Sequence, residues 1–177
     1  KGSIEMIVKG NRWNLMSNSI HFLDLFFFLS GEKKIKLIKN DLSKKVLNSK
    51  RTGFISLFGK ISINFFDSSK IIFEDKNEKK NNIIITIKNN DKKFSIVEKP
   101  RKIKLKITRK NKISTKLYKN FLISEIMTII LKQILLSGKS HLPSLKESTS
   151  HHLILLNVFL LHLRKINKKT IHNCRIT

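Results

Sequence analysis

Residues 58–66 read FGKISINFF, and this stretch decides what kind of structure the chain is expected to form. In it Ile61, Ile63 and Phe65 alternate with polar residues. Alternation with a period of two is typical of a strand that has one buried and one exposed face. Gly59 precedes the alternation, so the strand is entered through a glycine. The stretch therefore predicts a half-buried β-strand.

Further short apolar runs follow this strand at a spacing of roughly ten residues, which is typical of antiparallel meanders. Clusters rich in Asn, Asp, Ser and Lys separate the runs, as expected for turns. Residues 33–49 fit an edge strand followed by a loop, and periodicity leaves open whether residues 1–30 form a strand or a helix. The predicted strands are 54–66, 70–73, 83–87, 94–97 and 103–107.

Two later segments predict helices. In residues 116–137 apolar side chains recur every three or four residues, and Gly138 stands where a helix would end. We expect burial against the sheet to hold this helix, because its β-branched residues lower its intrinsic helix preference. Residues 151–166 are apolar almost all round, which is typical of a helix that is buried or docked on a partner.

The predicted fold class is therefore α+β, an antiparallel sheet packed by one or two amphipathic helices, with basic extensions. Residues 1–50 are interpreted as an N-terminal extension or edge strands, and residues 51–138 as a core domain of sheet plus helix. Residues 139–177 are interpreted as a loop, an apolar docking helix and a basic tail.

The charge of the chain points to a polyanionic partner. The 177 residues include 37 basic and 12 acidic ones, which gives a formal net charge of +25. Nucleic acid is the common partner of such a chain, and an anionic membrane surface the less common one. Alanine is absent while Ile, Asn, Lys and Phe abound, which indicates an AT-rich and organellar gene. That bias weakens an argument from lysine, but it does not explain the scarcity of acids.

The strongest candidate for nucleic-acid binding is residues 99–119, a basic run without an acidic residue. Such a run is often only a solvated face, but this one is structured and long enough to follow a phosphate backbone. Lysine positions a phosphate without reading sequence, whereas arginine binds it bidentately. The predicted RNA-binding residues are Lys60, Lys99, Arg101, Lys102, Lys104, Lys106, Arg109, Lys110, Lys112, Lys116, Lys119, Lys139, Arg164, Lys165, Lys168, Lys169 and Arg175.

The sequence shows no motif for catalysis or metal binding. The six histidines lack ligand spacing, Cys174 is the only cysteine, and no serine lies in a GxSxG motif. Residues 138–140 read GKS but lack the first glycine of a phosphate-binding loop. The longest apolar run, residues 22–29, is too short to span a bilayer. We therefore predict no enzyme, metal, cofactor or small-molecule substrate, and a membrane is the less favoured partner.

Residues 54–66, FISLFGKISINFF, resemble the glycine-containing strand-turn-strand of the large-subunit ribosomal protein six family. The match lies on Gly59, Ile61, Ser62 and Phe65, whereas Ser56 and Leu57 replace the first glycine and the proline of that family's pattern. The helix at 117–138, the GKSH at 138–141 and the VFLLHLRK at 158–165 are similar to later elements of the family. Its GYR-like segment and its C-terminal proline-tyrosine-lysine-glycine motif are missing.

The resemblance implies two related sheet-helix domains packed on large-subunit ribosomal RNA. The predicted function is a structural ribosomal RNA-binding protein of a mitochondrial ribosome, in the matrix, with ribosomal RNA and neighbouring ribosomal proteins as partners. A plastid is the alternative location. The alternative function is a basic accessory subunit on the matrix side of an organellar membrane complex. A third reading, a soluble enzyme from an AT-rich genome, is opposed by the missing acid-base constellation.

Overall fold

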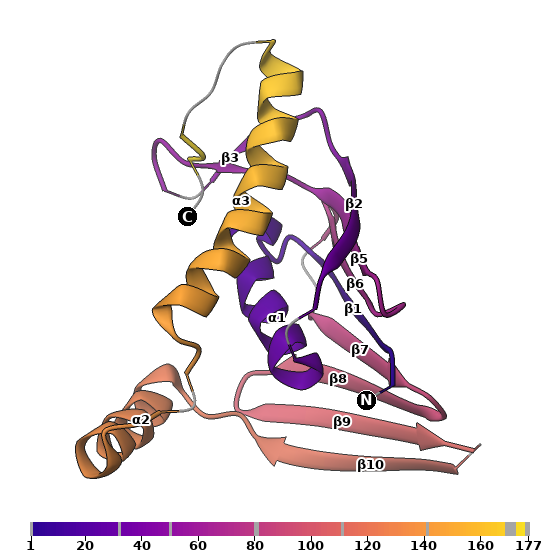
Figure 1. The fold of residues 1–177 in the computed structure, drawn as a ribbon, viewed down its shortest axis with the longest axis vertical. Helices are drawn as coiled ribbons and strands as arrows, with labels where there is room; N and C mark the ends of the chain where they lie inside the picture. The colour runs from indigo at the N-terminus through magenta and orange to yellow at the C-terminus, as the bar shows by residue number, and fades with distance from the viewer. Residues whose placement is uncertain are drawn as a thin grey trace.

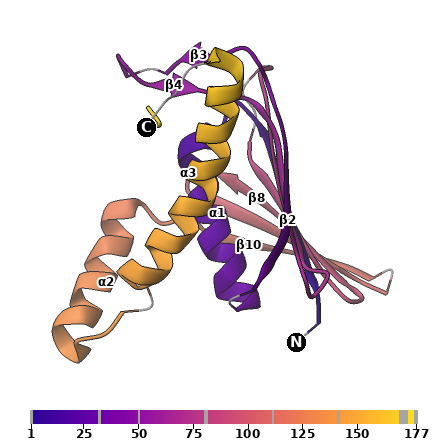
Figure 2. The same cartoon turned by 45° about the horizontal axis from the view of Figure 1, so that its top comes forward.

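The computed structural model describes residues 2–31, 33–49, 51–79, 82–110, 112–140, 142–168 and 173–175. An eight-stranded sheet forms one layer, and the helices lie on one side of it (Figures 1 and 2). The strands are β1 (Ile4–Asn11), β2 (Ile35–Leu42), β3 (Leu47–Asn48), β4 (Ile55–Ser56), β5 (Gly59–Phe65), β6 (Lys70–Lys76), β7 (Ile84–Asn89), β8 (Lys92–Lys99), β9 (Lys102–Arg109) and β10 (Lys112–Lys119). The helices are α1 (Leu15–Ser30), α2 (Ile123–Ser137) and α3 (Leu145–Asn167).

The order of strands in the large sheet is β10-β9-β8-β7-β1-β6-β5-β2, while β3 and β4 form a small separate pair. Neighbouring strands are antiparallel except β1 and β6, which run parallel. Since α1 follows β1 and packs against β6, this pair forms a unit in which a helix begins at the carboxyl end of a parallel strand. The predicted α+β class is confirmed, with a sheet that is mostly antiparallel rather than wholly so.

The alternating stretch at residues 58–66 forms β5, as its pattern predicts. Ile61, Ile63 and Phe65 are buried, whereas the residues between them are less so. Gly59 has φ 131° and pairs with Leu42 of β2, so the two backbones approach closely at this point.

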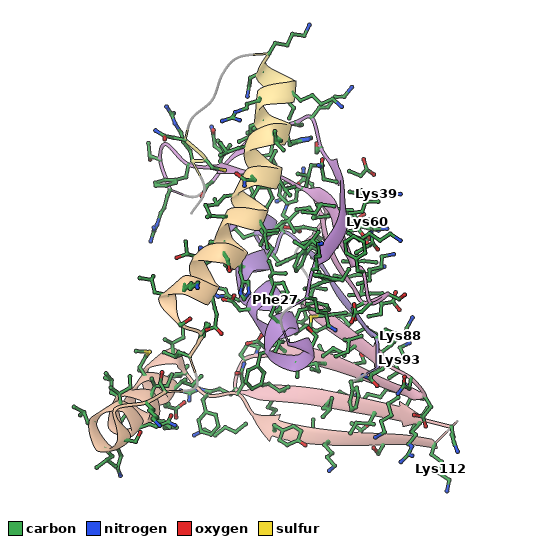
Figure 3. The ribbon with its side chains drawn as sticks, viewed as in Figure 1. Phe27, Lys39, Lys60, Lys88, Lys93 and Lys112 are labelled. Carbon is green, nitrogen blue, oxygen red and sulfur yellow. The ribbon has the colours of Figure 1, made fainter. Side chains whose placement is uncertain are left out.

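The core lies between the sheet and α1. Phe26 of α1 is fully buried and stacks on Phe65 of β5, with ring centroids 4.9 Å apart. Helix α3 packs on α1 and buries a stripe that includes Phe159. His151 joins these two helices, because its Nδ1 lies 2.6 Å from Asp24 Oδ1 and its ring stacks on Phe27 at 4.2 Å. Figure 3 labels Phe27 on α1.

The single helix predicted for residues 116–137 is wrong at its start. Residues 112–119 continue the sheet as β10, which pairs with β9 along its whole length, and the helix begins only at Ile123. Glu125 caps it by accepting a hydrogen bond from the Leu122 N–H at 2.6 Å. The expected burial against the sheet is also wrong, because α2 contains no buried residue and projects from the body of the molecule (Figure 1).

Helix α3 is longer than its apolar pattern indicates. It begins after Ser144, which forms a capping box with Glu147, and it runs to Asn167. It is buried along one face only, since Leu153 and Leu161 are exposed. In the part of the chain that the structure describes, no helix is long and apolar enough to cross a membrane.

Candidate functional site

A cavity of about 890 Å³ lies at the carboxyl end of β1. The turn from β1 into α1, the first turns of α1, the β3–β4 segment and the end of β6 form its walls. In sheets with parallel strands, ligands are commonly bound outside the carboxyl ends of the strands. The lining residues are Arg12, Trp13, Asn14, Ser17, Asn18, His21, Leu47, Asn48, Ser49, Arg51, Ser56, Leu57, Phe58, Asp75 and Ile83.

The turn that borders this cavity has an unusual backbone. Arg12 and Asn14 both have positive φ, 51° and 71°, although neither is glycine. Such conformations cost of the order of 1–3 kcal/mol each and persist where the surrounding structure fixes them. Here the Arg12 N–H donates to the Lys76 carbonyl at 3.0 Å, and the Asn18 side chain donates to the Trp13 carbonyl at 2.6 Å.

Asp75 of β6 is the main anchor of the turn. Its two carboxylate oxygens accept hydrogen bonds from the N–H groups of Trp13 at 3.2 Å and Leu15 at 3.0 Å. The carboxyl group is 1% exposed, and this burial raises its pKa above the ordinary value, while the backbone hydrogen bonds oppose the rise. Asp75 therefore fixes the entrance to α1, and its oxygens are already occupied by backbone donors.

The remaining wall supplies hydrogen-bonding groups of several kinds. His21 projects from the second turn of α1 and is the only imidazole that the described residues place on the wall, with amides at Asn14, Asn18 and Asn48. Imidazole exchanges protons near neutral pH, and amides and hydroxyls suit a hydroxylated ligand. Among the described residues, no group of three or more His, Cys, Asp or Glu could hold a metal ion.

The predicted RNA-binding residues do not converge on this cavity. Lys102, Lys104 and Lys106 point away from the helices, because the alternate residue Leu105 pairs with Ile96 on the helix-facing side. Figure 3 shows Lys60 and Lys112 on widely separated strands of the sheet. Lys99, Arg101, Arg109, Lys110, Lys116 and Lys119 lie on or beside the β8–β10 strands, and Lys139 follows α2. Arg164, Lys165 and Lys168 end α3, Arg175 lies near β4, and Lys169 is outside the described residues.

Several residues of the basic group are engaged in ion pairs. Arg109 Nε lies 3.1 Å from Asp91 Oδ2, and Lys119 Nζ lies 3.1 Å from Glu125 Oε1. Sequence reasoning selected these residues by charge, and it missed every residue of the cavity wall. One signal was available: arginine is rare in the chain, and two of the six arginines line this cavity.

No family model matches the chain, and no curated protein matches it by sequence. Solved structures share its fold. A Gfo/Idh/MocA family oxidoreductase from Vibrio cholerae has TM-score 0.59 and 13% identity over 94% of this chain and 55% of its own. The 3-ketoreductase KijD10 from Actinomadura kijaniata, a K102E mutant in complex with TDP-benzene and NADP, has TM-score 0.59 and 10% identity. The match covers 89% of this chain and 51% of KijD10. A super-repressor mutant of Gal80p from Saccharomyces cerevisiae has TM-score 0.56 and 12% identity, over 97% of this chain and 59% of Gal80p.

These likenesses correct several predictions. The resemblance to the large-subunit ribosomal protein six family is wrong, because the fold is shared with oxidoreductases. The predicted ribosomal RNA-binding function, its membrane-subunit alternative and the ribosomal partners fail with it. The predictions of no enzyme and no small-molecule substrate are contradicted too, since KijD10 is a ketoreductase with bound TDP-benzene and NADP. The organellar location and the three-part division of the chain stay predictions.

The chain spans only about half the length of these solved structures, and its residues do not fit a nicotinamide dinucleotide. A dinucleotide-binding domain has a parallel sheet and a GxGxxG loop between its first strand and helix. The six glycines of this chain form no such motif, and the turn between β1 and α1 reads NRWN. The described sheet is almost entirely antiparallel. The described part of the chain therefore lacks the features by which such a domain holds a dinucleotide.

Proposed function

We propose that this chain is the substrate-binding half of an oxidoreductase, and that the cavity at the carboxyl end of β1 holds a small hydroxylated substrate. The observation that carries the proposal is His21 on the wall of a cavity whose other polar residues are amides, hydroxyls, two arginines and the buried Asp75, beside an apolar part of the wall that includes Trp13. The shared fold with oxidoreductases supports it, since enzymes of that architecture are about twice as long as this chain.

His21 has the role of exchanging a proton with a substrate hydroxyl or carbonyl oxygen. Oxidation of an alcohol requires a base for the hydroxyl proton, and a positioned imidazole performs such transfers near neutral pH. Asn14 and Asn18 would orient the remaining hydroxyls, because an amide both donates and accepts hydrogen bonds. Asp75 is less suited to the proton transfer, since both its oxygens accept backbone N–H groups.

The proposal is tested by ligand-observed NMR on the purified chain with neutral sugars and cyclic polyols, and separately with NADP. We expect binding of one or more polyols, its weakening in a His21→Gln variant, and no binding of NADP to this chain. Perturbation of the His21 imidazole resonances by the polyol would place the ligand in the cavity. Absence of any polyol binding, or binding that leaves the His21 resonances and the variant's affinity unchanged, would refute the proposal.

A further inference from the structure

The cavity wall has a selective composition of charged groups. Arginine contributes only six of the 37 basic residues of the chain, and lysine all the others. Two of those arginines, Arg12 and Arg51, line the cavity, and none of the lysines that the structure describes does. Among the described residues, Asp75 is the only acidic one on the wall. The described part of the wall is therefore cationic through guanidinium groups.

Neither guanidinium is neutralised by a nearby carboxylate. Over the described ranges of the chain, no acidic side chain forms an ion pair with Arg12 or Arg51. Arg12 donates through Nε to the neutral amide oxygen of Asn77 at 3.0 Å. This contact orients the side chain without cancelling its charge. The carboxylate of Asp75 is buried, and it is already shared between two backbone N–H groups.

The two arginines come from different walls of the cavity. Arg12 ends β1, where its left-handed backbone is held by the hydrogen bond to the Lys76 carbonyl. Arg51 lies in the turn between β3 and β4, and Ser56 of β4 donates to the Asn14 side chain at 3.3 Å. This hydrogen bond connects the two segments. A non-glycine residue in a sparsely populated backbone conformation is a frequent feature of ligand sites.

We infer that Arg12 and Arg51 bind an anionic group, and that the substrate is a sugar-like molecule that carries a phosphate or a carboxylate. Guanidinium binds both anions through paired N–H donors, in a geometry that the lysine ammonium does not offer. The volume of about 890 Å³ accommodates a sugar together with its anionic substituent. The inference rests on the proposed function, because it names the class of substrate for the same cavity.

The test is isothermal titration calorimetry of the purified chain with four probes at physiological salt. Glucose is the neutral probe, glucose 1-phosphate and UDP-glucose carry phosphate, and glucuronate carries a carboxylate. Trp13 is the only tryptophan and lines the cavity, so its fluorescence gives a second readout. We expect at least one anionic probe to bind ten-fold or more tightly than glucose, and the comparison of phosphate with carboxylate identifies the anion.

Variants distinguish specific binding of the anion by Arg12 and Arg51 from general electrostatic attraction of anions to a chain of net charge +25. Arg12→Gln and Arg51→Gln are each expected to weaken binding of the anionic probe by ten-fold or more, and to weaken binding of glucose by a clearly smaller factor. Lys104→Gln is the matched control, since it removes the same charge from the opposite face of the sheet, and we expect a change of less than two-fold. Arg51→Lys keeps the charge but not the paired donors, and it is expected to restore only a small part of the affinity.

Two outcomes would overturn the inference, and they differ in what they say of the proposed function. Glucose binding with no gain from the anion, or equal losses in Lys104→Gln and the arginine variants, would refute the anion site and leave the substrate cavity intact. No binding of any of the four probes would refute both. The variants' circular dichroism spectra, which we expect to match that of the unaltered chain, exclude misfolding as the cause of a loss.

Discussion

Replacement of Gly59 by alanine tests how β5 joins β2. The glycine has φ 131°, a conformation that residues with a side chain rarely adopt. A Cβ at this position would lie 2.3 Å from the Asp41 carbonyl oxygen and 2.7 Å from the Leu42 Cα, and both are backbone atoms that have no free rotation. The strand must therefore shift away from β2, or the pairing between them must break.

The expected loss of stability has two parts. The backbone conformation costs about 1–3 kcal/mol for a residue other than glycine. Forcing an additional carbon into a packed position costs about 1–3 kcal/mol more. We therefore expect Gly59→Ala to lower the free energy of unfolding by roughly 2–6 kcal/mol. Gly53→Ala is the matched control, because Gly53 has φ 84° but no atom within 4 Å of the added Cβ. Gly53→Ala should lose only the stability that the unfavourable backbone conformation costs, about 1–3 kcal/mol.

The assay is urea unfolding of both variants, followed by the fluorescence of Trp13, which is 3% exposed in the folded chain. The midpoint of Gly59→Ala should fall below that of Gly53→Ala by roughly 1 M, since small proteins have slopes of about 1–3 kcal/mol per molar urea. Equal midpoints for the two variants would show that β2 and β5 are not as close as described, and the reasoning would fail.

Three further predictions concern buried polar groups. The unaltered chain should gain stability as the pH falls through the raised pKa of Asp75 towards 3.8, because the folded chain binds this proton more tightly than the unfolded chain. In Asp75→Asn this gain should be absent from chemical-denaturation curves measured between pH 7 and pH 4, and a gain equal to that of the unaltered chain would contradict the prediction. Asp24→Ala removes the carboxylate that contacts the buried His151, and it should lower the free energy of unfolding in urea by about 1–3 kcal/mol. Asp91→Ala removes one partner of an exposed ion pair and should lower it by less than about 1 kcal/mol. Equal losses in the two variants would contradict the role of burial. Burial raises the pKa of the Cys174 thiol to about 11, so its reaction with a disulfide reagent at pH 8 should be on the order of 100-fold slower in the folded than in the unfolded chain, and equal rates would contradict it.

The sheet was largely predictable from the sequence. Residues 59–65, 84–89 and 102–109 have apolar residues at alternate positions, and this pattern reports directly which side of a strand is buried. Residues 112–119 were missed because Leu117 and the apolar residues after it also fit helical spacing. Pairing with β9 settles their conformation, and a local pattern does not contain that information.

The candidate site was not predictable by the same means. Its wall combines Arg12 and His21 with Arg51 and Asp75, which are brought together only when β1 pairs with β6, about 65 residues later in the chain. Each is an ordinary polar residue in its own segment. Charge was a misleading guide, because many of the lysines are exposed residues on strands. The density of charge along the sequence says little about where a cavity forms.

The central position of β1 has a consequence for how the chain acquires its structure. This strand precedes both of its partners along the chain, since β6 and β7 begin only at Lys70 and Ile84. Met6 and Val8, both fully buried in the finished sheet, stay uncovered until then. β1 also joins β10-β9-β8-β7 to β6-β5-β2, so its insertion converts two separate small sheets into one. Loss of β1 would therefore leave each half of the sheet with an open edge, one at β7 and one at β6.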